Sequence, residues 1–333
     1  MLIDDLIAGG APASGTTIAP ILERLRAAHK FAIAPDATAV ADALANDYGG
    51  LTRAFAHCRI PFAETWLEFA HMDRPNFANA PVQAPHFQMR PHRVGYLLSA
   101  LRNDLSAWKA HLFWSINDNQ CSTAPMAMTF DMTRPLGGRL TLPTEEQNAR
   151  RRLAQQQRGI VDVDQVDVHP GWKAGTDAQR LTMLQHTLPT TTDFPPPPPL
   201  GLITKQERDR FYEMVMDLAA SDWAGEPSFL LALVGLLNAR NAVETELVDQ
   251  ARLNRARVKR GRLPFFEHHV LRIARRQIVR IYGEAGARGN HAPMRGHFVR
   301  GHWKVRRTGI YFWHPHARGD FRRGRIDKDY ELA

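Results

Sequence analysis

Apolar side chains recur with helical spacing in several parts of the chain. Between residues 18 and 25 they occupy positions i, i+3, i+4 and i+7, which predicts a helix with one buried stripe. A second helix is predicted to begin at Asp36, whose carboxylate can accept hydrogen bonds from the first free amides. Residues 204–207, Thr-Lys-Gln-Glu, have the pattern of a capping box and predict another helix start. Residues 226–241 are apolar nearly all round, so we expect them to form the most buried helix.

Strand-like runs replace this spacing between about residues 61 and 132. The runs 64–69, 93–98 and 110–116 are rich in β-branched and aromatic residues and are separated by connections rich in Pro and Asn. This pattern suits an antiparallel meander. A further strand is predicted over residues 268–275, beyond a Pro turn. Together the patterns predict an α+β fold with helical elements and an antiparallel sheet.

The C-terminal region predicts a basic β-hairpin. Two strand-like arms flank residues 306–309, Arg-Arg-Thr-Gly, and Gly309 can adopt the positive φ of a tight turn. Because side chains alternate along a strand, Trp303 and Val305 share a face that resembles a core face. The other face of the first arm carries cations and imidazoles.

Composition shifts divide the chain into three regions. Residues 1–143 hold the first helices and the meander, and residues 204–333 hold the later helices and the basic β region. Residues 144–203 between them are polar and end in five consecutive prolines, which favour an extended polyproline rod. We expect this middle region to be an insertion or a linker.

The charge is concentrated at one end of the chain. The formal net charge is +9, but residues 251–333 contain 21 Lys and Arg against 6 Asp and Glu, whereas residues 1–250 carry a net charge of −6. A basic end on an acidic body suggests a polyanionic partner, and nucleic acid is the first choice. The alternative for the charge is a solvated face rich in Arg, and the alternative for the hairpin is that it packs on the acidic body.

No membrane partner is expected. The longest apolar run, residues 229–237, is far shorter than the roughly 20 residues that cross a bilayer. The first residues are acidic where a secretory signal would be basic, and the chain has only two cysteines. These features predict a protein of the reducing cytoplasm, here that of a host cell.

Single-stranded nucleic acid needs cations for its phosphates and flat rings for its bases, and the C-terminal region has both. RNA is the favoured ligand. If about five cations touched phosphates, the affinity would fall with salt with a log–log slope of roughly −3.5. The candidate nucleic-acid-binding residues are Arg295, Arg300, His302, Trp303, Lys304, Arg306, Arg307 and Arg318.

A metal site is the second interpretation of the same region. His314 and His316 lie two residues apart, so on one strand their rings point the same way, and His302 on the partner arm can add a third imidazole. The surrounding cations disfavour a dication, and imidazoles that bond backbone or phosphate are the alternative. No cofactor is expected, because glycine-rich phosphate loops are absent. Cys58 and Cys121 have no nucleophile motif and are expected to be small core residues.

The C-terminal region resembles uncharacterised proteins of phages and bacterial mobile elements. The likeness rests on Leu-Asn-Arg-Ala-Arg-Val-Lys-Arg-Gly at residues 253–261, His-His-Val at 268–270 and Arg-Gly-His-Trp at 300–303. Residues 300–303 also resemble the end of the type V anti-CRISPR family that blocks production of the CRISPR nuclease. That family acts during synthesis of its target, so the resemblance implies a host or CRISPR protein partner. The likeness covers about the last 80 residues, and residues 304–309 depart from the family's form.

Three functional hypotheses follow from these patterns. The first is a phage-type accessory protein without enzymatic activity that binds RNA or a ribonucleoprotein through its basic C-terminal sheet, with anti-CRISPR-like inhibition of nuclease production as its extension. The second is a metal-dependent nuclease built on the three histidines. The third is a phage assembly protein that contacts DNA.

Overall fold

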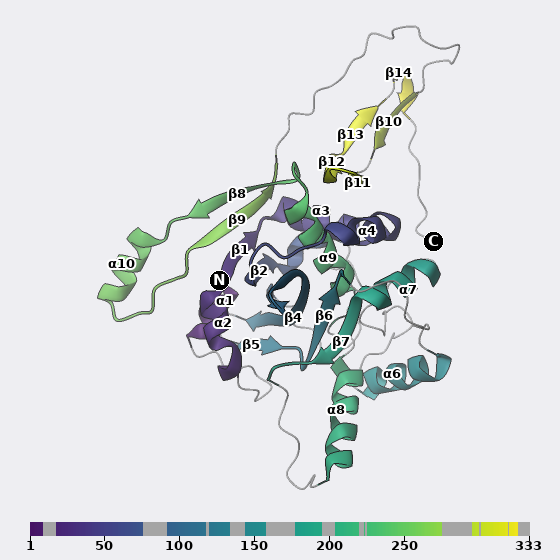
Figure 1. The fold of residues 1–333 in the computed structure, drawn as a ribbon. Helices are drawn as coiled ribbons and strands as arrows, with labels where there is room; N and C mark the ends of the chain where they lie inside the picture. Colours follow the sequence, from purple (N-terminus) through teal and green to yellow (C-terminus); the bar gives the residue numbers. More distant parts are fainter. Residues whose placement is uncertain are drawn as a thin grey trace.

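A nine-stranded sheet forms the centre of the molecule (Figure 1). The computed structural model describes residues 1–8, 18–75, 92–117, 120–133, 144–157, 177–194, 204–219, 223, 225–274, 295–299, 301–318 and 320–325. Within them the strand order is β7-β6-β4-β3-β2-β1-β9-β8, with β5 beside β4. The strands of this sheet are β1 (His29–Ile33), β2 (Glu64–Ala70), β3 (Arg93–Leu101), β4 (Asp104–Asn117), β5 (Gln120–Thr123), β6 (Met126–Asp131), β7 (Thr187–Thr191), β8 (Val243–Val248) and β9 (His268–Ile273).

The α+β prediction is confirmed, but the sheet is mixed and the prediction of an antiparallel sheet is wrong. Strands β2, β3 and β4 form the expected antiparallel meander. Strand β1, however, runs parallel to both β2 and β9. The reason is the helical connection between β1 and β2, which returns the chain to the end of the sheet from which β1 started.

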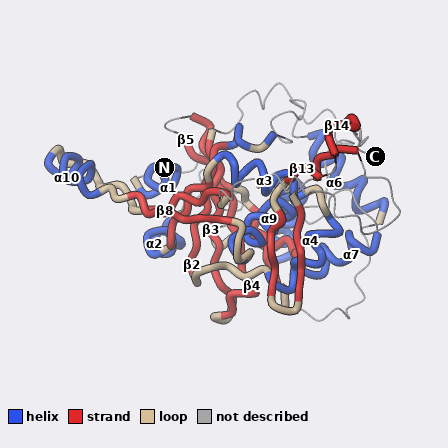
Figure 2. Tube along the Cα trace, turned by 90° about the horizontal axis from the view of Figure 1, so that it is seen from above, coloured by secondary structure: helices blue, strands red, loops and turns tan. Residues whose placement is uncertain are grey.

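Helices cover both faces of the sheet (Figure 2). Alternation along β2 sends Leu67 and Phe69 into the larger core cluster with α3, α4 and α9, and sends Trp66 into a second cluster with α1 and α2. The helices are α1 (Leu2–Ile7), α2 (Leu22–Ala27), α3 (Pro35–Ala45), α4 (Tyr48–Ala54), α6 (Glu145–Gln157), α7 (Asp177–His186), α8 (Lys205–Ala219), α9 (Glu226–Asn238) and α10 (Ala251–Lys259), with 3-10 turns η1 (Ala19–Ile21), η2 (Phe55–His57) and η3 (His71–Asp73).

The helix starts were mostly predictable. The 18–25 stripe forms η1 and α2, with Ile21 and Leu25 fully buried. Helix α3 begins at Pro35, one residue before the predicted start, and the Asp36 carboxylate accepts from the next amide along. The capping box is confirmed, because the side chains at residues 204 and 207 each accept from the other residue's backbone N–H, at 2.8 and 3.2 Å.

Helix α9 is confirmed as a buried helix. Every residue from Glu226 to Leu236 is buried, and the ring of Phe229 lies 5.1 Å from that of Phe69 on β2. The helix follows Gly225, whose φ of 71° is in the left-handed region that favours glycine. Pro227 stands in the first turn, where its missing N–H has no intrahelical acceptor to lose.

A buried ionic network joins α9 to the sheet and to α3. The Arg74 guanidinium is fully buried, lies 2.6 Å from a Glu226 carboxylate oxygen and 3.4 Å from one of Asp42, and stacks on Phe229 at 3.9 Å. The Tyr96 hydroxyl donates to the other Glu226 oxygen. Burial and then the Glu226 charge raise the pKa of Tyr96, so this hydroxyl stays a donor.

The sheet draws on all three regions expected from the sequence. Strand β9, from the C-terminal region, lies between β1 and β8, and β7, from the middle region, pairs with β6. Met183 and Phe194 of the middle region are buried. The polyproline run lies outside the described residues. Within the described part of the chain, no helix is both long and apolar enough to span a bilayer.

We predict that Glu226→Gln lowers the free energy of unfolding by about 3–5 kcal/mol, because it removes the nearest counter-charge of a fully buried guanidinium. Urea denaturation measures the effect. The matched control is Glu244→Gln, the same change at an exposed position on β8, which should stay within about 0.5 kcal/mol. Equal effects of the two substitutions would contradict the central role of the network.

Candidate nucleic-acid interface

The C-terminal strands form a long interrupted hairpin. Strands β11 (His302–Arg306) and β12 (Gly309–Trp313) pair antiparallel, with Arg306 opposite Gly309. Strands β10 (Arg295–Val299) and β13 (His316–Arg318) continue the same pairing, and β14 (Asp320–Arg325) lies parallel to β10. The second arm is interrupted at Pro315, which has no N–H for the ladder.

The inner face of the β11–β12 hairpin packs on α9. Trp303 is 3% exposed and meets Phe312 edge-on, with 5.8 Å between ring centroids. A Cβ added at Gly235 of α9 would lie 3.1 Å from the Trp303 indole, so the close approach depends on glycine. The sequence placed Trp303 among the nucleic-acid-binding residues, whereas the structure places it in the core.

A side-chain amide fixes the second strand of the hairpin to the end of α9. Asn241 donates to the Phe312 carbonyl oxygen at 2.9 Å and accepts from the Phe312 N–H at 3.1 Å. The N–H of Arg240 donates to the Ile310 carbonyl oxygen at 3.4 Å. Backbone groups on the free edge of β12 therefore find hydrogen-bond partners in residues 240 and 241, which follow α9.

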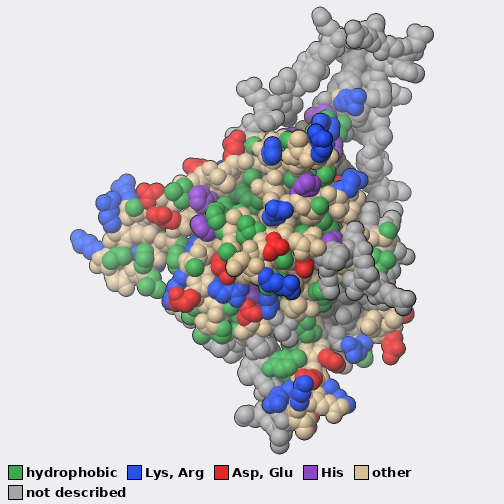
Figure 3. Space-filling view, viewed as in Figure 1, with side chains coloured by type: hydrophobic (Ala, Val, Ile, Leu, Met, Phe, Trp, Pro, Cys, Tyr) green, Lys and Arg blue, Asp and Glu red, His purple; other side chains and the backbone are tan. Residues whose placement is uncertain are grey.

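The outer face of the hairpin combines an exposed indole with cations. Trp313 is 41% exposed, the Lys304 ammonium lies 3.8 Å from the centre of its ring, and the His302 ring lies 5.7 Å away. Arg306 and Arg307 are exposed at the turn and form no ion pair with any described residue. Figure 3 shows Lys, Arg and His side chains gathered over this end of the molecule.

Of the other residues predicted to bind nucleic acid, the structure describes the side chain of Arg318 but not those of Arg295 and Arg300. Arg318 is exposed on β13, opposite His297 on β10. Arg295 occupies the first position of β10, and only its backbone is described. Arg300 lies outside the described residues. Trp313 was not among the predicted residues, although counting back from the turn at residues 306–309 would have placed it opposite His302.

An open hollow of about 280 Å³ adjoins the exposed indole. Its lining consists of Asn241, Phe312, Trp313, His314 and His316. The Nε2 atom of His314 lies 3.3 Å from the Asn241 carbonyl oxygen, and Nδ1 of His316 lies 3.1 Å from the His314 carbonyl oxygen. One ring nitrogen of each of these two histidines is therefore within hydrogen-bond distance of a backbone carbonyl oxygen.

The three histidines of the predicted metal site do not converge. His302 packs against Trp313 on the outer face, whereas His314 packs against Phe312, 4.9 Å away, and Phe312 belongs to the inner face. Alternation along the strands causes this separation. Among the described residues, no group of three or more His, Cys, Asp or Glu side chains is arranged to hold a metal ion.

The cysteines behave as predicted from the sequence. Both are buried free thiols. Burial raises the pKa of Cys58 to about 12 and that of Cys121 to about 11. Both thiols are therefore protonated at neutral pH and serve as small core residues.

A polar cluster that no sequence motif predicts lies on the α1–α2 face of the sheet. The Asp193 carboxylate lies 2.5 Å from Arg24, 2.5 Å from Lys109 and 3.3 Å from Nε2 of His111. Hydrogen bonds from His111 and Lys109 hold the pKa of Asp193 well below its usual range, against the effect of burial, and burial lowers the pKa of His111. The cluster ties the chain after β7 to β4 and α2.

Comparison with protein-family models, with curated proteins and with solved structures gave no match.

We predict that Gly235→Val detaches the hairpin from α9, because the added methyl groups overlap the Trp303 indole. Overpacking of this kind costs about 1–3 kcal/mol. Hydrogen exchange should show faster exchange at the Phe312 amide. Adding Trp303→Leu to this variant makes room and should restore part of the protection. Unchanged exchange in the Gly235→Val protein would show that the contact does not hold the hairpin.

We predict a pH-dependent loss of stability through His111. Its pKa is lowered in the folded state, so as the pH falls below about 6.5 the unfolded chain takes up the proton first and stability decreases. The depressed pKa of Asp193 adds a further loss as the pH falls below about 4. Urea unfolding between about pH 7.5 and pH 5 should give a shallower decline for His111→Gln than for the unchanged protein. Parallel curves would contradict this assignment.

Proposed function

We propose that the protein binds single-stranded RNA, alone or within a ribonucleoprotein, through the outer face of the β11–β12 hairpin. The observation that carries the proposal is the exposed Trp313 indole with the Lys304 ammonium above it. An isolated surface tryptophan needs no explanation, but Trp313 lies beside cations, and neither β11 nor β12 contains an acidic residue. Such a face suits a chain of bases joined by phosphates.

Two kinds of side chain would contact the RNA, an aromatic ring for the bases and cations for the phosphates. The indole offers a flat surface on which a base can stack, and stacking is available only where bases are unpaired. Arg306 and Arg307 are exposed at the turn and can contact the phosphates. The hydroxyl groups of Tyr311 and Thr308, 3.0 Å apart, add acceptors for a ribose 2′-hydroxyl, which favours RNA over single-stranded DNA.

The phage-type origin and the anti-CRISPR activity stay predictions. A phage-type origin is implied by the likeness of residues 253–261, 268–270 and 300–303, and inhibition of CRISPR nuclease production by that of residues 300–303 alone, of which Arg300 is not among the described residues. The structure offers no observation that favours the nuclease alternative. RNA binding by the hairpin is the part of the proposal that the geometry supports.

We predict that the combined change Lys304→Gln, Arg306→Gln and Arg307→Gln weakens binding to a fluorescein-labelled oligouridylate of about 12 nucleotides at least tenfold. The log–log salt slope should become shallower by about 2, since each lost contact with a single strand removes roughly 0.7. Trp313→Ala should weaken binding by about 1–3 kcal/mol through lost stacking and leave the slope unchanged. Fluorescence anisotropy at several salt concentrations measures both quantities.

The matched control is Lys205→Gln, Arg208→Gln and Arg210→Gln on α8, which removes the same charge from another exposed surface. It should alter affinity by less than about twofold, because charges beyond a Debye length are screened. If the two triple variants lose affinity equally, only long-range charge is at work. If Trp313→Ala has no effect, the stacking role is wrong.

A further inference from the structure

A second basic surface lies on an arm that projects from the sheet (Figures 1 and 2). The arm consists of β8, α10, the returning residues 260–267 and β9, and β8 is the edge strand. No residue of α10 is buried. Residues 251–259 belong to the basic end of the chain, and no helix was predicted for them from the sequence.

The tip of the arm is held in one conformation by its own contacts. The Asn254 side chain accepts from the Phe265 N–H at 2.7 Å and donates to the Phe265 carbonyl oxygen at 2.8 Å. The Arg257 guanidinium lies 3.6 Å from the centre of the Phe265 ring, and its Nε donates to the Leu263 carbonyl oxygen. One side of α10 is therefore packed against the returning chain.

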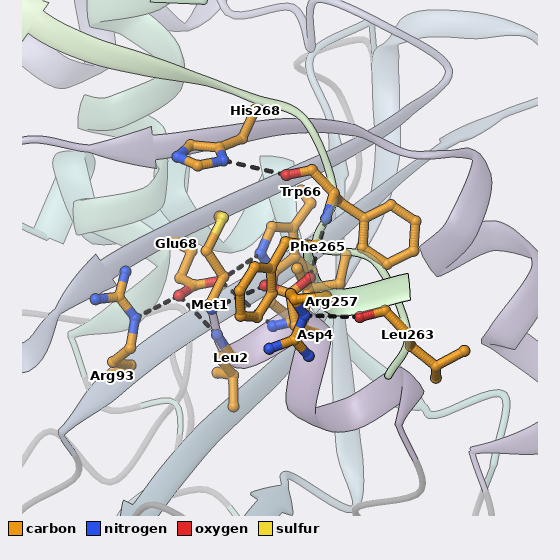
Figure 4. Close-up of polar contacts among 12 residues, drawn as sticks. Met1, Leu2, Asp4, Trp66, Glu68, Arg93, Arg257, Leu263, Phe265 and His268 are labelled. Atoms are coloured by element: carbon orange, nitrogen blue, oxygen red, sulfur yellow. Dashed lines mark hydrogen bonds and ion pairs between the residues drawn. The ribbon is translucent and has the colours of Figure 1, made fainter. Parts of the chain in front are cut away.

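The base of the arm is fixed to the N-terminal helix (Figure 4). The Phe266 N–H donates to the Asp4 carboxylate at 3.1 Å, and the Lys30 ammonium lies 4.4 Å from the Phe266 ring. The fully buried Glu68 holds α1 in turn, because its carboxylate accepts from the Leu2 N–H at 2.8 Å. A pre-ordered arm loses little conformational entropy on binding.

The free side of α10 is cationic. With about 100° between successive residues, Arg252, Arg255 and Lys259 fall within an arc of about 60°, opposite the side packed on Phe265. All three are exposed and form no ion pair with any described residue. The exposed acids Glu244 and Glu246 lie on β8, in the stem of the arm, and Asp249 lies just before α10, whereas α10 itself carries cations and no acid (Figure 3).

We propose that α10 is a docking element for duplex DNA, with Arg252, Arg255 and Lys259 on consecutive phosphates beside the major groove. The seven residue steps from Arg252 to Lys259 rise about 10 Å, and one DNA strand presents a phosphate about every 3.4 Å of the helix axis. A major groove about 12 Å wide admits an α-helix, whereas the major groove of duplex RNA is too narrow. The acidic stem repels phosphates from the sheet and confines the duplex to the tip.

This site is independent of the proposed RNA binding by the hairpin. The tip of the arm has no exposed tryptophan or tyrosine on which a base could stack, and its face is cationic alone. Phosphate contacts of this kind position a duplex without reading its sequence. The two surfaces therefore call for different ligands.

The test uses the full chain and a fluorescein-labelled DNA duplex of about 20 base pairs. We expect Arg252→Gln, Arg255→Gln and Lys259→Gln together to weaken binding at least tenfold and to make the log–log salt slope shallower by about 3, roughly 0.9 per phosphate contact. An unrelated duplex sequence should give the same result. Because α10 buries no residue, thermal unfolding should be unchanged, and this is checked first.

Variants of identical charge separate the proposals. The α8 triple variant should bind the duplex as the unchanged protein does, and the hairpin triple variant should lose RNA but keep the duplex. Unchanged duplex affinity in the α10 variant, an equal loss in the α8 variant, or tighter binding of duplex RNA than of duplex DNA would each overturn the proposal.

Discussion

The burial of α9 is the constraint on which the rest of the structure depends. A helix that is apolar on all sides must be covered on all sides, and its eleven consecutive buried residues show that it is. The sheet covers it through Phe69, α3 and α4 cover its flanks, and Trp303 covers Gly235. The hairpin is therefore part of the core as well as the carrier of a basic face.

This constraint decides which side of the hairpin meets solvent. Once Trp303 and Phe312 pack inward, strand alternation leaves Lys304 and Trp313 outward. The first turn of α9 carries a charge that is buried with the helix, because the Glu226 carboxylate pairs with the Arg74 guanidinium 2.6 Å away. Packing thus fixes both the buried ion pair and the exposed ring.

The sequence predicted what depends on neighbouring residues. Helix starts, the meander and the turn near Gly309 follow from local spacing, and the structure has them in nearly the expected places. It could not predict that β1 would pair with β9, since more than 230 residues separate these strands. The polar cluster at Asp193 was missed for the same reason: Arg24, Lys109 and Asp193 come from distant segments and share no motif.

The same limit explains the errors at the candidate site. Alternation within each arm alone allows the histidines to meet, but the pairing register places His302 opposite Trp313 and His314 on the other face. Residue type alone favours Trp303 as a binding residue, but its position on the inner face buries it. Residue type suggests a chemistry, and only the pairing register decides whether the group is available for it.

The fold divides the net positive charge of the C-terminal region between two separate surfaces. A net charge of +15 read along the chain suggests one continuous polyanion surface, but the cations are presented on two elements of different kinds. The hairpin pairs its cations with an exposed indole, and α10 presents cations without a ring. Glu244 and Glu246 lie on the stem of the arm and interrupt the field between the two. Because screening limits such fields to about 8–10 Å in physiological salt, the charge that a ligand would meet at either surface comes from the side chains of that surface, whatever the total charge of the chain.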